Sequence, residues 1–493
     1  MWFLIVLAVV FLALRFLNLT LLPVFADEAI YIHWAQVVWH DATNRFISLS
    51  DGKPPLFMWL MVPFLKVISD PLLAGRLLSV ISGLMTLIGS YLLAKKLFSK
   101  KVAILVGVFI VCQPFLFFYD RMALVDSMLT AFGVWSFYLA FLLFEKPNIA
   151  RGMLLGTIWG GSMLTKPGGA FFPLLTPFFI FLTPFKKWQK KIKKLIVPSL
   201  LASGYGLGFY NVLRLSGAFH MIRSRSADYI RGKADLLTNP FQFIPDTGGA
   251  MFTWLINYFS WFGIAWLIAG LILALVKKEK KIGLLFIWTA FPFLVPAAIG
   301  KIIYARYLLI IVPFWLIISS WAVWQAASLI KKRWWRMTVW LLVGLTIGIW
   351  LSFTRWLIID PAKAPLHHGE KEQYLHEWAA GYGIKEVADY LKLLPRDKEI
   401  EVATEGYFGT LPNGLQIYMD QVEGVSVNGV GQPIFYLPDG VLEALTEGKQ
   451  AYLVVNSTRL KIEDQSRLEL IGEYSKPEGP KGQEKLLFFK VRP

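Results

Sequence analysis

Cysteine is almost absent from this 493-residue chain, since Cys112 is the only one and falls inside a hydrophobic run. A single cysteine excludes both a disulfide framework and a cysteine-based metal site within one chain. Charged residues are also scarce, at 17%, whereas hydrophobic residues make up 56% and the mean hydropathy is +0.53. This balance is typical of an integral membrane protein.

Acidic residues are few in the first 360 positions. Residues 361–493 carry 15 basic and 20 acidic residues, a net charge of −5, and the whole chain carries +17, which leaves +22 for the first 360 residues. A basic balance can indicate nucleic-acid binding. Here the basic residues lie in short loops between hydrophobic runs, so we interpret them as topology signals and expect no nucleic-acid partner.

Hydrophobic runs of membrane-spanning length recur up to about residue 358 and are lacking after it. We predict about eleven spans, near residues 2–22, 72–94, 102–118, 127–144, 152–165, 170–185, 195–213, 251–276, 282–299, 308–329 and 337–358. No basic segment or convincing cleavage site precedes Asp27, so we expect the first span to be retained. The sequence therefore predicts a transmembrane domain over residues 1–360 and a soluble domain over residues 361–493.

Alternate loops between the predicted spans hold most of the basic residues. They lie near residues 95–101, 145–151, 186–194, 277–281 and 331–336, and they contain 20 basic residues against two acidic ones. The positive-inside rule makes these loops cytoplasmic. The intervening loops, and the C-terminal domain after an odd number of spans, are then predicted to be extracytoplasmic.

Additional elements are predicted outside the spans. Residues 29–38 are amphipathic, and residues 56–67 form a short apolar run, so both suit helices at the membrane interface. In the C-terminal segment, a helical pattern near 383–394 and strand-like runs at 399–404, 451–455, 468–474 and 486–491 predict a small α/β domain. The predicted fold class is therefore an α-helical polytopic membrane protein with interfacial helices and a C-terminal α/β domain.

Ionisable and tyrosine residues recur at the predicted extracytoplasmic ends of the spans. Charged groups are costly at a membrane boundary, and they indicate a functional site. The set contains Asp27, Glu28, Lys53, Asp120, Arg121, Asp126, Lys166, Tyr304, Arg306 and Tyr307. Carboxylates with scattered cations at one rim of the membrane favour group transfer from a phosphate-bearing lipid.

The chemistry of such a transfer needs both kinds of charge. A carboxylate such as Asp27 or Glu28 can accept the proton of an attacking hydroxyl. Fixed cations such as Lys53 or Arg306 can stabilise a leaving phosphate, and arginine binds phosphate in a bidentate manner. In a helix, Asp27, Tyr31 and Trp34 would share one face.

Plainer interpretations remain open for each residue. Two acids at a helix N-terminus interact favourably with the helix dipole. Lys53 could anchor a loop by snorkelling, and Arg121 could pair with a nearby acid. Lys166 lies where a span breaks, which often lines a site, and His33 fits a pocket wall or an interface. Residues 214–246 could be a mobile flap or a lipid-binding belt. His367, His368 and His376, with neighbouring glutamates, are interpreted as a solvated linker rather than as a metal site.

The order of these motifs resembles the polyprenyl-phosphate-dependent C-type (GT-C) glycosyltransferases, especially the protein O-mannosyltransferases and the lipid A aminoarabinose transferases. The resemblance covers about residues 1–320. It rests on Asp27-Glu28 after the first span, Lys53-Pro54-Pro55-Leu56, Asp120-Arg121 with Asp126, Lys166, and the run from Arg306 to Pro313.

The resemblance implies an inverting enzyme that uses a sugar linked to undecaprenyl or dolichyl phosphate. It implies Asp27 as the base, with Lys53, Arg121 and Arg306 on the lipid phosphate, and Asp126 and Lys166 shaping the pocket. No divalent metal or other cofactor is expected. A prokaryotic plasma-membrane enzyme is favoured, because the chain lacks a β-trefoil domain and the Trp-Trp-Asp signature of oligosaccharyltransferases. The acceptor could be a protein, a lipid or a glycan.

Two other classes of function are compatible with the sequence. A transporter or lipid flippase would show broken helices, midplane charges and an internal repeat, and no repeat is visible. A non-catalytic membrane scaffold would present residues 361–493 to a partner, and Asp27 and Lys53 would then be dispensable.

Overall fold

The computed structural model describes residues 2–239 and 241–493, which form two compact units. The first unit contains Met1–Leu17, Phe46–Phe57 and Leu77–Ile359, and the second contains Asn18–Arg45, Met58–Arg76 and Asp360–Pro493. The placement of the domain boundary at residue 360 stays a prediction. The second unit includes two segments from the N-terminal quarter of the chain in addition to the C-terminal residues. Composition alone does not predict that these segments belong to the same unit.

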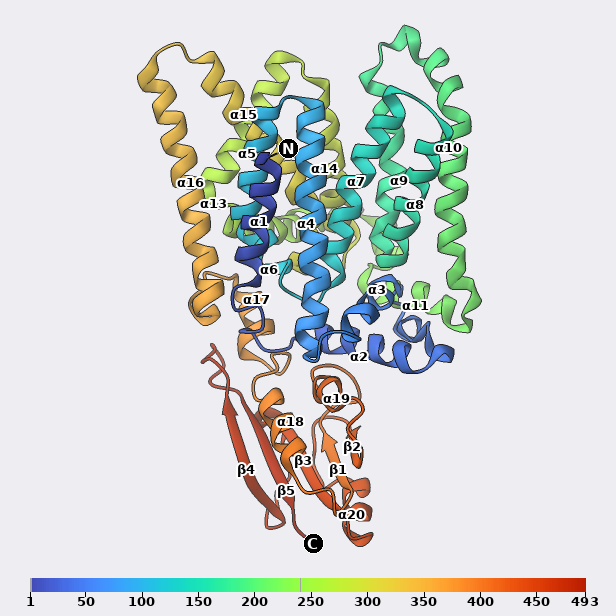
Figure 1. The fold of residues 1–493 in the computed structure, drawn as a ribbon, viewed down its shortest axis with the longest axis vertical. Helices are drawn as coiled ribbons and strands as arrows, with labels where there is room; N and C mark the ends of the chain where they lie inside the picture. The colour runs from blue at the N-terminus through green and yellow to red at the C-terminus, as the bar shows by residue number, and fades with distance from the viewer. Residues whose placement is uncertain (1, 240) are drawn as a thin grey trace. The chain divides into compact units, whose positions relative to one another are not determined.

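The first unit is a bundle of apolar helices (Figure 1). Its long elements are α1 (Trp2–Phe16), α4 (Pro71–Leu97), α5 (Lys100–Cys112), α7 (Val125–Glu145), α8 (Ile149–Thr165), α10 (Trp188–Asn211), α13 (Ile244–Lys277), α14 (Lys280–Ile299), α15 (Val312–Leu329) and α16 (Arg333–Ile359). Shorter ones are α6 (Pro114–Tyr119), α9 (Phe171–Leu175), α11 (Met221–Tyr229), α12 (Lys233–Thr238) and the 3-10 turns η2 (Ile47–Asp51) and η8 (Ala305–Ile311).

Seven helical segments among the described residues are long and apolar enough to cross a membrane. Shorter apolar helices occur at Trp2–Phe16, Leu56–Leu65 and Pro167–Leu182. The predicted multi-pass helical fold is therefore confirmed, whereas the count of eleven spans stays a prediction.

Two predicted spans are interrupted by their own sequence. The predicted span 102–118 divides into α5 and α6 because Pro114 cannot donate an amide hydrogen bond and starts a new helix at N1. Helix α13 breaks at Ser260, whose φ of 58° lies in the left-handed region. The carbonyl of Phe259 beside this break accepts a hydrogen bond from Trp350 Nε1 at 2.8 Å, so a neighbouring side chain supplies a donor there.

The basic turns gather at one end of the first unit (Figure 1). Lys281 Nζ donates to the carbonyl of Leu97 at 2.7 Å, and Lys96 pairs with Glu145 at 2.8 Å. Turns from three different helix connections therefore lie side by side, as the topology prediction requires.

The second unit contains a five-stranded sheet in the order β2-β1-β3-β5-β4. Strands β1 (Ile400–Thr404), β2 (Val425–Gly429) and β3 (Gln450–Asn456) are parallel, whereas β5 (Lys485–Val491) is antiparallel to β3 and to β4 (Leu468–Ser475). Four predicted strands and the helix α18 (Ile384–Leu393) are confirmed. Strand β2 and the helices α19 (Asn413–Met419) and α20 (Asp439–Thr446) are short and were not predicted.

Both helices predicted in the first outer segment exist, as α2 (Ala26–His40) and α3 (Leu56–Leu65). Helix α2 belongs to the second unit, because its N-terminus is bonded to the C-terminal domain. Ala26 N–H donates to the carbonyl of Ala379 at 3.1 Å, and Gly381 N–H donates to the carbonyl of Val24 at 2.9 Å. This short antiparallel bridge fixes where the helix that carries Asp27 begins.

The interpretation of residues 367–376 as a solvated linker is wrong. The segment folds into α17 (His368–Lys371) and the π-helical turn η10 (Glu372–His376). Its apolar residues Tyr374 and Leu375 are buried, and so is Glu370. Burial of one face against the domain core stabilises this short helical segment in place of an open linker.

Candidate functional site

Three predicted site residues meet at a single carboxylate in the first unit. Asp126 lies in the first turn of α7, and its Oδ1 accepts a hydrogen bond from Lys166 Nζ at 2.7 Å. Arg306 Nε lies 3.9 Å from Asp126 Oδ2. Asp126 is 3% exposed and Arg306 is 7% exposed, so the pair is shielded from solvent. Two cations against one carboxylate give this group a net charge of +1.

Local sequence positions each member of this group. Lys166 is the C-cap of α8, and Pro167 follows it, so the chain changes direction at the lysine. Arg306 lies in η8, the 3-10 turn that precedes α15. Helix ends and turns thus converge here, as expected where irregular backbone lines a membrane-embedded site.

Tyrosine rings flank the two cations. Lys166 Nζ lies 4.0 Å from the centre of the Tyr307 ring, and Arg306 Cζ lies 4.9 Å from the centre of the Tyr304 ring. The two rings are 5.7 Å apart and nearly perpendicular. Such cation–π contacts hold a cation in position without neutralising it. The structure therefore brings together five of the predicted residues.

Asp120 belongs to a separate buried pair. Its Oδ2 lies 3.4 Å from Arg15 Nε, and its Oδ1 accepts a hydrogen bond from Ser127 Oγ at 3.0 Å. Arg15 also donates to the carbonyls of Val111 and Ile110, at the end of α5. The sequence suggested that Arg121 could pair with a nearby acid, Asp120 or Asp126. The described contacts instead pair Asp120 with Arg15, which satisfies the helix end that Pro114 leaves open.

Gly83 allows this close approach of Asp120. A Cβ atom at position 83 would lie 2.4–2.6 Å from the three carboxylate atoms of Asp120. Any side chain there would displace the buried carboxylate, so a residue without Cβ is required.

Arg121 points its guanidinium at the end of α1. It donates to the carbonyl of Leu17 at 2.7 Å and to that of Leu14 at 3.4 Å, and it lies 4.9 Å from the centre of the Phe117 ring. These contacts satisfy carbonyls that the end of a helix leaves without internal partners. A phosphate-binding role for Arg121 stays a prediction.

Lys53 is joined to the segment that was predicted to be a flap or a belt. Its Nζ lies 3.3 Å from Asp51 Oδ2, and Asp51 Oδ1 lies 3.2 Å from Arg225 Nε in α11. The turn between them needs glycine, because Gly52 has φ of 67° and its Cβ would meet the Met221 carbonyl at 2.6 Å. Helix α11 is therefore packed on the Lys53 turn.

The two neighbouring carboxylates of α2 have different environments. Glu28 is fully buried, and its oxygens accept hydrogen bonds from Arg76 at 2.8 and 2.7 Å and from the Phe25 amide at 3.0 Å. Asp27, in the same helical turn, is partly exposed. Burial and bidentate pairing assign Glu28 to holding the helix start, which leaves Asp27 as the accessible carboxylate of the pair.

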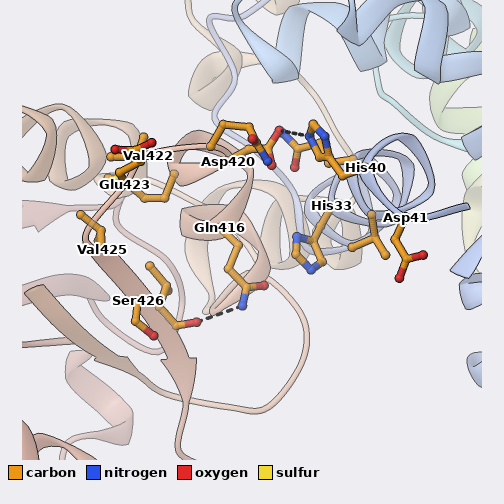
Figure 2. Close-up of a pocket in the computed structure, with 14 residues that line it drawn as sticks. His33, His40, Asp41, Gln416, Asp420, Val422, Glu423, Val425 and Ser426 are labelled. Carbon is orange, nitrogen blue, oxygen red and sulfur yellow. Dashed lines mark hydrogen bonds and ion pairs between the residues drawn. The ribbon is translucent and has the colours of Figure 1, made fainter. Parts of the chain in front are cut away.

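Tyr31 and His33 lie on different faces of α2. Tyr31 is buried, with its ring 6.1 Å from that of Trp34, which in turn lies 5.7 Å from Phe408. His33 lines a cavity of 620 Å³ within the second unit (Figure 2). Burial lowers the pKa of His33, and the carboxylate of Asp420 opposes this shift.

Sequence reasoning missed the two arginines that organise these regions. Arg15 and Arg76 are fully buried, and each binds a carboxylate from a distant segment. Their signal was present in the sequence, because each is an isolated cation inside a hydrophobic run, where charges are retained for a purpose. No group of three or more metal-binding side chains occurs among residues 2–239 and 241–493.

The comparisons with known proteins agree with this architecture. Residues 52–203 match the family model described as dolichyl-phosphate-mannose-protein mannosyltransferase. ArnT from Cupriavidus metallidurans in the apo state superposes with a TM-score of 0.61 at 15% identity, over 98% of this chain and 97% of that one. The chain has the fold of a GT-C glycosyltransferase. The predicted resemblance to the mannosyltransferases and aminoarabinose transferases is thus confirmed.

Two further solved structures share the fold. ArnT bound to undecaprenyl phosphate matches with a TM-score of 0.57 at 14% identity, over 98% of this chain and 97% of that one. The oligosaccharyltransferase AglB from Archaeoglobus fulgidus, in complex with an inhibitory peptide and a dolichol-phosphate, matches with a TM-score of 0.53 at 13% identity. That match covers 100% of this chain and 74% of AglB. The search of curated proteins found no match.

Proposed function

We propose that this chain is an integral-membrane inverting glycosyltransferase that moves a sugar from a polyprenyl phosphate, such as undecaprenyl phosphate, to a hydroxyl acceptor. The observation that carries the proposal is the group of Asp126, Lys166 and Arg306, in which two cations lie against one buried carboxylate. Support comes from the shared fold, because related structures are described with undecaprenyl phosphate or dolichol-phosphate bound.

Lys166 and Arg306 are proposed to hold the donor phosphate. Each is already oriented by Asp126 and by a tyrosine ring, so little side-chain ordering is needed when an anion arrives. A phosphate that loses its sugar gains negative charge, and preorganised cations stabilise that charge best where water is excluded. These cations would do the work of a divalent metal, so we propose that no metal is required.

Asp27 is proposed as the general base. The acceptor oxygen forms a bond to the anomeric carbon while the bond from that carbon to the phosphate oxygen breaks. The bonding electron pair leaves with the phosphate, and the hydroxyl proton passes to the Asp27 carboxylate. Partial exposure of Asp27 supports this role, and the bidentate contact of Glu28 with Arg76 supports a positioning role for Glu28.

The side of the membrane is part of the proposal. The basic turns that gather at one end of the helices would face the cytoplasm of a prokaryotic cell. The donor-binding group and the C-terminal domain would then be extracytoplasmic. The experiment below identifies the transferred sugar, hexose or pentose, from the donor that is turned over. The acceptor is a protein, a lipid or a glycan.

The test is donor turnover by purified protein. Wild type and Asp27→Asn are incubated with a panel of undecaprenyl-phosphate sugars and mixed hydroxyl acceptors, and free undecaprenyl phosphate is measured. Release from one donor that depends on Asp27 is the expected result. Equal release by both proteins would refute Asp27 as the base, and chelation of divalent metals should leave the rate unchanged.

A transporter or flippase is the second candidate, and the break of α13 at Ser260 is the observation that favours it. Discontinuous helices in transporters present their freed backbone groups to a substrate. Here Trp350 bonds the Phe259 carbonyl, and Gln113 Nε2 approaches that of Tyr258 at 3.4 Å. Side chains of the protein thus occupy the break, which favours a structural role. Lipid translocation without product formation, in proteoliposomes, would reverse this preference.

A further inference from the structure

The second unit contains a groove that the proposed reaction does not use. Its cavity of 620 Å³ is bounded by one face of α2, by the end of α19 and by β2 (Figure 2). His33, Gln36 and His40 come from α2 at helical spacing, and Gln416 and Asp420 come from the opposite wall. This face of α2 is rotated by roughly 150°, nearly half a turn, from the face that carries Asp27, Tyr31 and Trp34.

One wall of the groove is the edge of a β-sheet. Strand β2 is the outermost strand and pairs only with β1. Ile400 N–H donates to the Gly424 carbonyl at 2.8 Å, and Val430 N–H donates to the Thr404 carbonyl at 2.9 Å. Along a strand of a parallel pair, the backbone groups of successive residues point alternately toward and away from the partner. The backbone N–H and C=O groups of the even-numbered residues of β2 therefore point toward β1.

The backbone groups of Val425 and Val427 therefore point away from β1. Both residues line the groove, and the Val427 carbonyl accepts a hydrogen bond from Gln416 Nε2 at 3.0 Å. Among the described residues, no hydrogen-bond acceptor is recorded for the outward N–H groups of Val425 and Val427. An open sheet edge of this kind is a template for another extended chain.

The groove has acidic walls and contains no lysine or arginine. Asp41, Asp420 and Glu423 line it, and Asp420 Oδ2 lies 3.0 Å from His40 Nε2. Its other lining residues are valine, methionine, histidine, serine and glutamine, with no phenylalanine, tyrosine or tryptophan. In addition, Gln36 is 5% exposed, and its Oε1 accepts no hydrogen bond from a described residue. A bound molecule could supply the missing hydrogen-bond donor.

We propose that this groove binds an extended, basic polypeptide segment, which pairs with the open edge of β2 and places lysine or arginine side chains against Asp41, Asp420 and Glu423. Pairing along a sheet edge supplies affinity through main-chain hydrogen bonds, and flanking side chains supply specificity. The segment is recognised in the C-terminal domain as part of a hydroxyl-bearing protein acceptor. That last assignment rests on the proposed function, whereas the binding site itself does not.

Charge and composition distinguish a peptide from other occupants. A phosphate-bearing lipid or a nucleic acid would meet three carboxylates without a compensating cation, which is unfavourable. An oligosaccharide would find no phenylalanine, tyrosine or tryptophan ring on which to stack in this lining. The five residues of β2 offer an edge about 17 Å long, enough for about five residues of an extended guest.

The experiment measures fluorescence anisotropy of a labelled nine-residue peptide of alternating lysine, serine and valine against the detergent-solubilised full chain. Val427→Pro removes one outward N–H, and proline is tolerated when an edge strand turns that N–H toward solvent. We expect Val427→Pro to weaken peptide binding by about tenfold. The matched variant Val427→Thr keeps the N–H and should bind like wild type.

A second pair of variants tests the charge of the groove. Glu423→Lys reverses one lining charge and should weaken binding by about tenfold at low salt, with a smaller effect at high salt. Glu463→Lys makes the same change at an exposed acid outside the groove and should have little effect. Glu423 is exposed, so loss of folding does not complicate this test.

Several outcomes would overturn the inference. These are absence of saturable binding, equal affinity for Val427→Pro and Val427→Thr, or displacement of the peptide by an uncharged oligosaccharide at equal concentration. Peptide binding by Asp27→Asn should match wild type, so failure of the peptide site and failure of the proposed transferase activity give different results.

Discussion

Arg76 holds both carboxylate oxygens of Glu28, at 2.8 and 2.7 Å, although 48 positions separate them in the sequence. The same guanidinium donates to the carbonyls of Leu19, Leu22 and Pro23. One buried cation therefore fixes the chain that leads into α2 together with the first turn of that helix. Asp27 lies in this turn, so its orientation depends on a contact made by its neighbour.

The first prediction separates Glu28 from Asp27. Glu28→Gln leaves the buried Arg76 without its charge partner, and breaking a buried pair costs about 3–5 kcal/mol. The unfolding temperature of the purified protein should fall clearly in Glu28→Gln. It should change little in Asp27→Asn, which instead should abolish transfer.

A stable Glu28→Gln protein that has lost transfer would reassign the catalytic role to Glu28. The companion variant Arg76→Met removes the opposite charge and should be destabilised to a similar extent, because the buried carboxylate is then unpaired. Matching losses in the two variants identify the ion pair, rather than either side chain alone, as the stabilising feature.

The second prediction concerns Gly83. A Cβ atom there would lie 2.4 Å from Asp120 Cγ, so Gly83→Ala must displace a carboxylate that Arg15 and Ser127 hold. We expect a loss of about 3 kcal/mol in the free energy of unfolding, from steric strain and a perturbed ion pair.

Gly344→Ala is the control for this change. A Cβ atom at Gly344, within α16, would meet nothing within 4 Å. In a helix interior that replacement should be neutral or stabilise the protein by up to about 1 kcal/mol. Similar unfolding temperatures for the two variants would refute the close approach of Asp120 to Gly83.

Periodicity and charge patterning were sufficient for most of the fold. Long apolar runs predicted the helices, and short apolar, strand-like runs predicted four of the five strands, because burial favours apolar residues in both. Strand β2 was not predicted, because its sequence, Val-Ser-Val-Asn-Gly, is short and half exposed. Such a strand is defined by its partner β1 rather than by its own pattern.

The candidate site was predictable as a set of residues but not as a set of pairs. Asp126, Lys166 and Arg306 are ionisable groups at span ends, which local sequence reveals. Local sequence did not reveal the partner of Asp120. Arg15 lies 105 positions away, whereas Arg121 is adjacent in the chain. Side-chain partners across such distances depend on how the helices pack, and one sequence alone contains no direct record of it.

The third prediction is a pH dependence from Lys476 in the C-terminal domain. Burial lowers the pKa of Lys476 to about 8 from an ordinary value of 10.5, and the carboxylates of Glu484 and Glu405 oppose this shift. Below pH 8, the folded and unfolded states both bind the proton. Between pH 8 and 10 the unfolded state binds more protons than the folded state, so stability rises with pH by about 2 kcal/mol.

The measurement is the difference in unfolding temperature between wild type and Lys476→Met at pH 7, 8, 9 and 10. The variant lacks the titrating amine, so its own pH profile should be flatter than that of wild type over this interval. Burial raises the pKa of Tyr382 to about 12, which opposes the trend only above pH 10. A wild-type profile that falls between pH 8 and 10, relative to the variant, would contradict the prediction.

The last prediction tests how the two cations bind the donor. Lys166→Ala removes the closer cation of the Asp126 group and leaves one carboxylate facing one arginine, so its net charge falls from +1 to zero. The KM for the lipid donor should rise by about tenfold or more, because a charge-assisted contact to phosphate is lost. Lys190→Ala, in α10, removes a lysine that is not part of this group and should leave KM unchanged.

Arg306→Lys separates the effect of charge from that of geometry. It keeps the positive charge and removes the planar guanidinium group. Lysine binds phosphate as a point charge, whereas arginine can use two parallel hydrogen bonds. An intermediate rise in KM is therefore expected if Arg306 binds the phosphate, and no rise if it serves only to orient Asp126. If both Lys166→Ala and Arg306→Lys lower kcat while KM stays at the wild-type value, the two cations act on the transition state alone, and ground-state phosphate binding belongs to other residues.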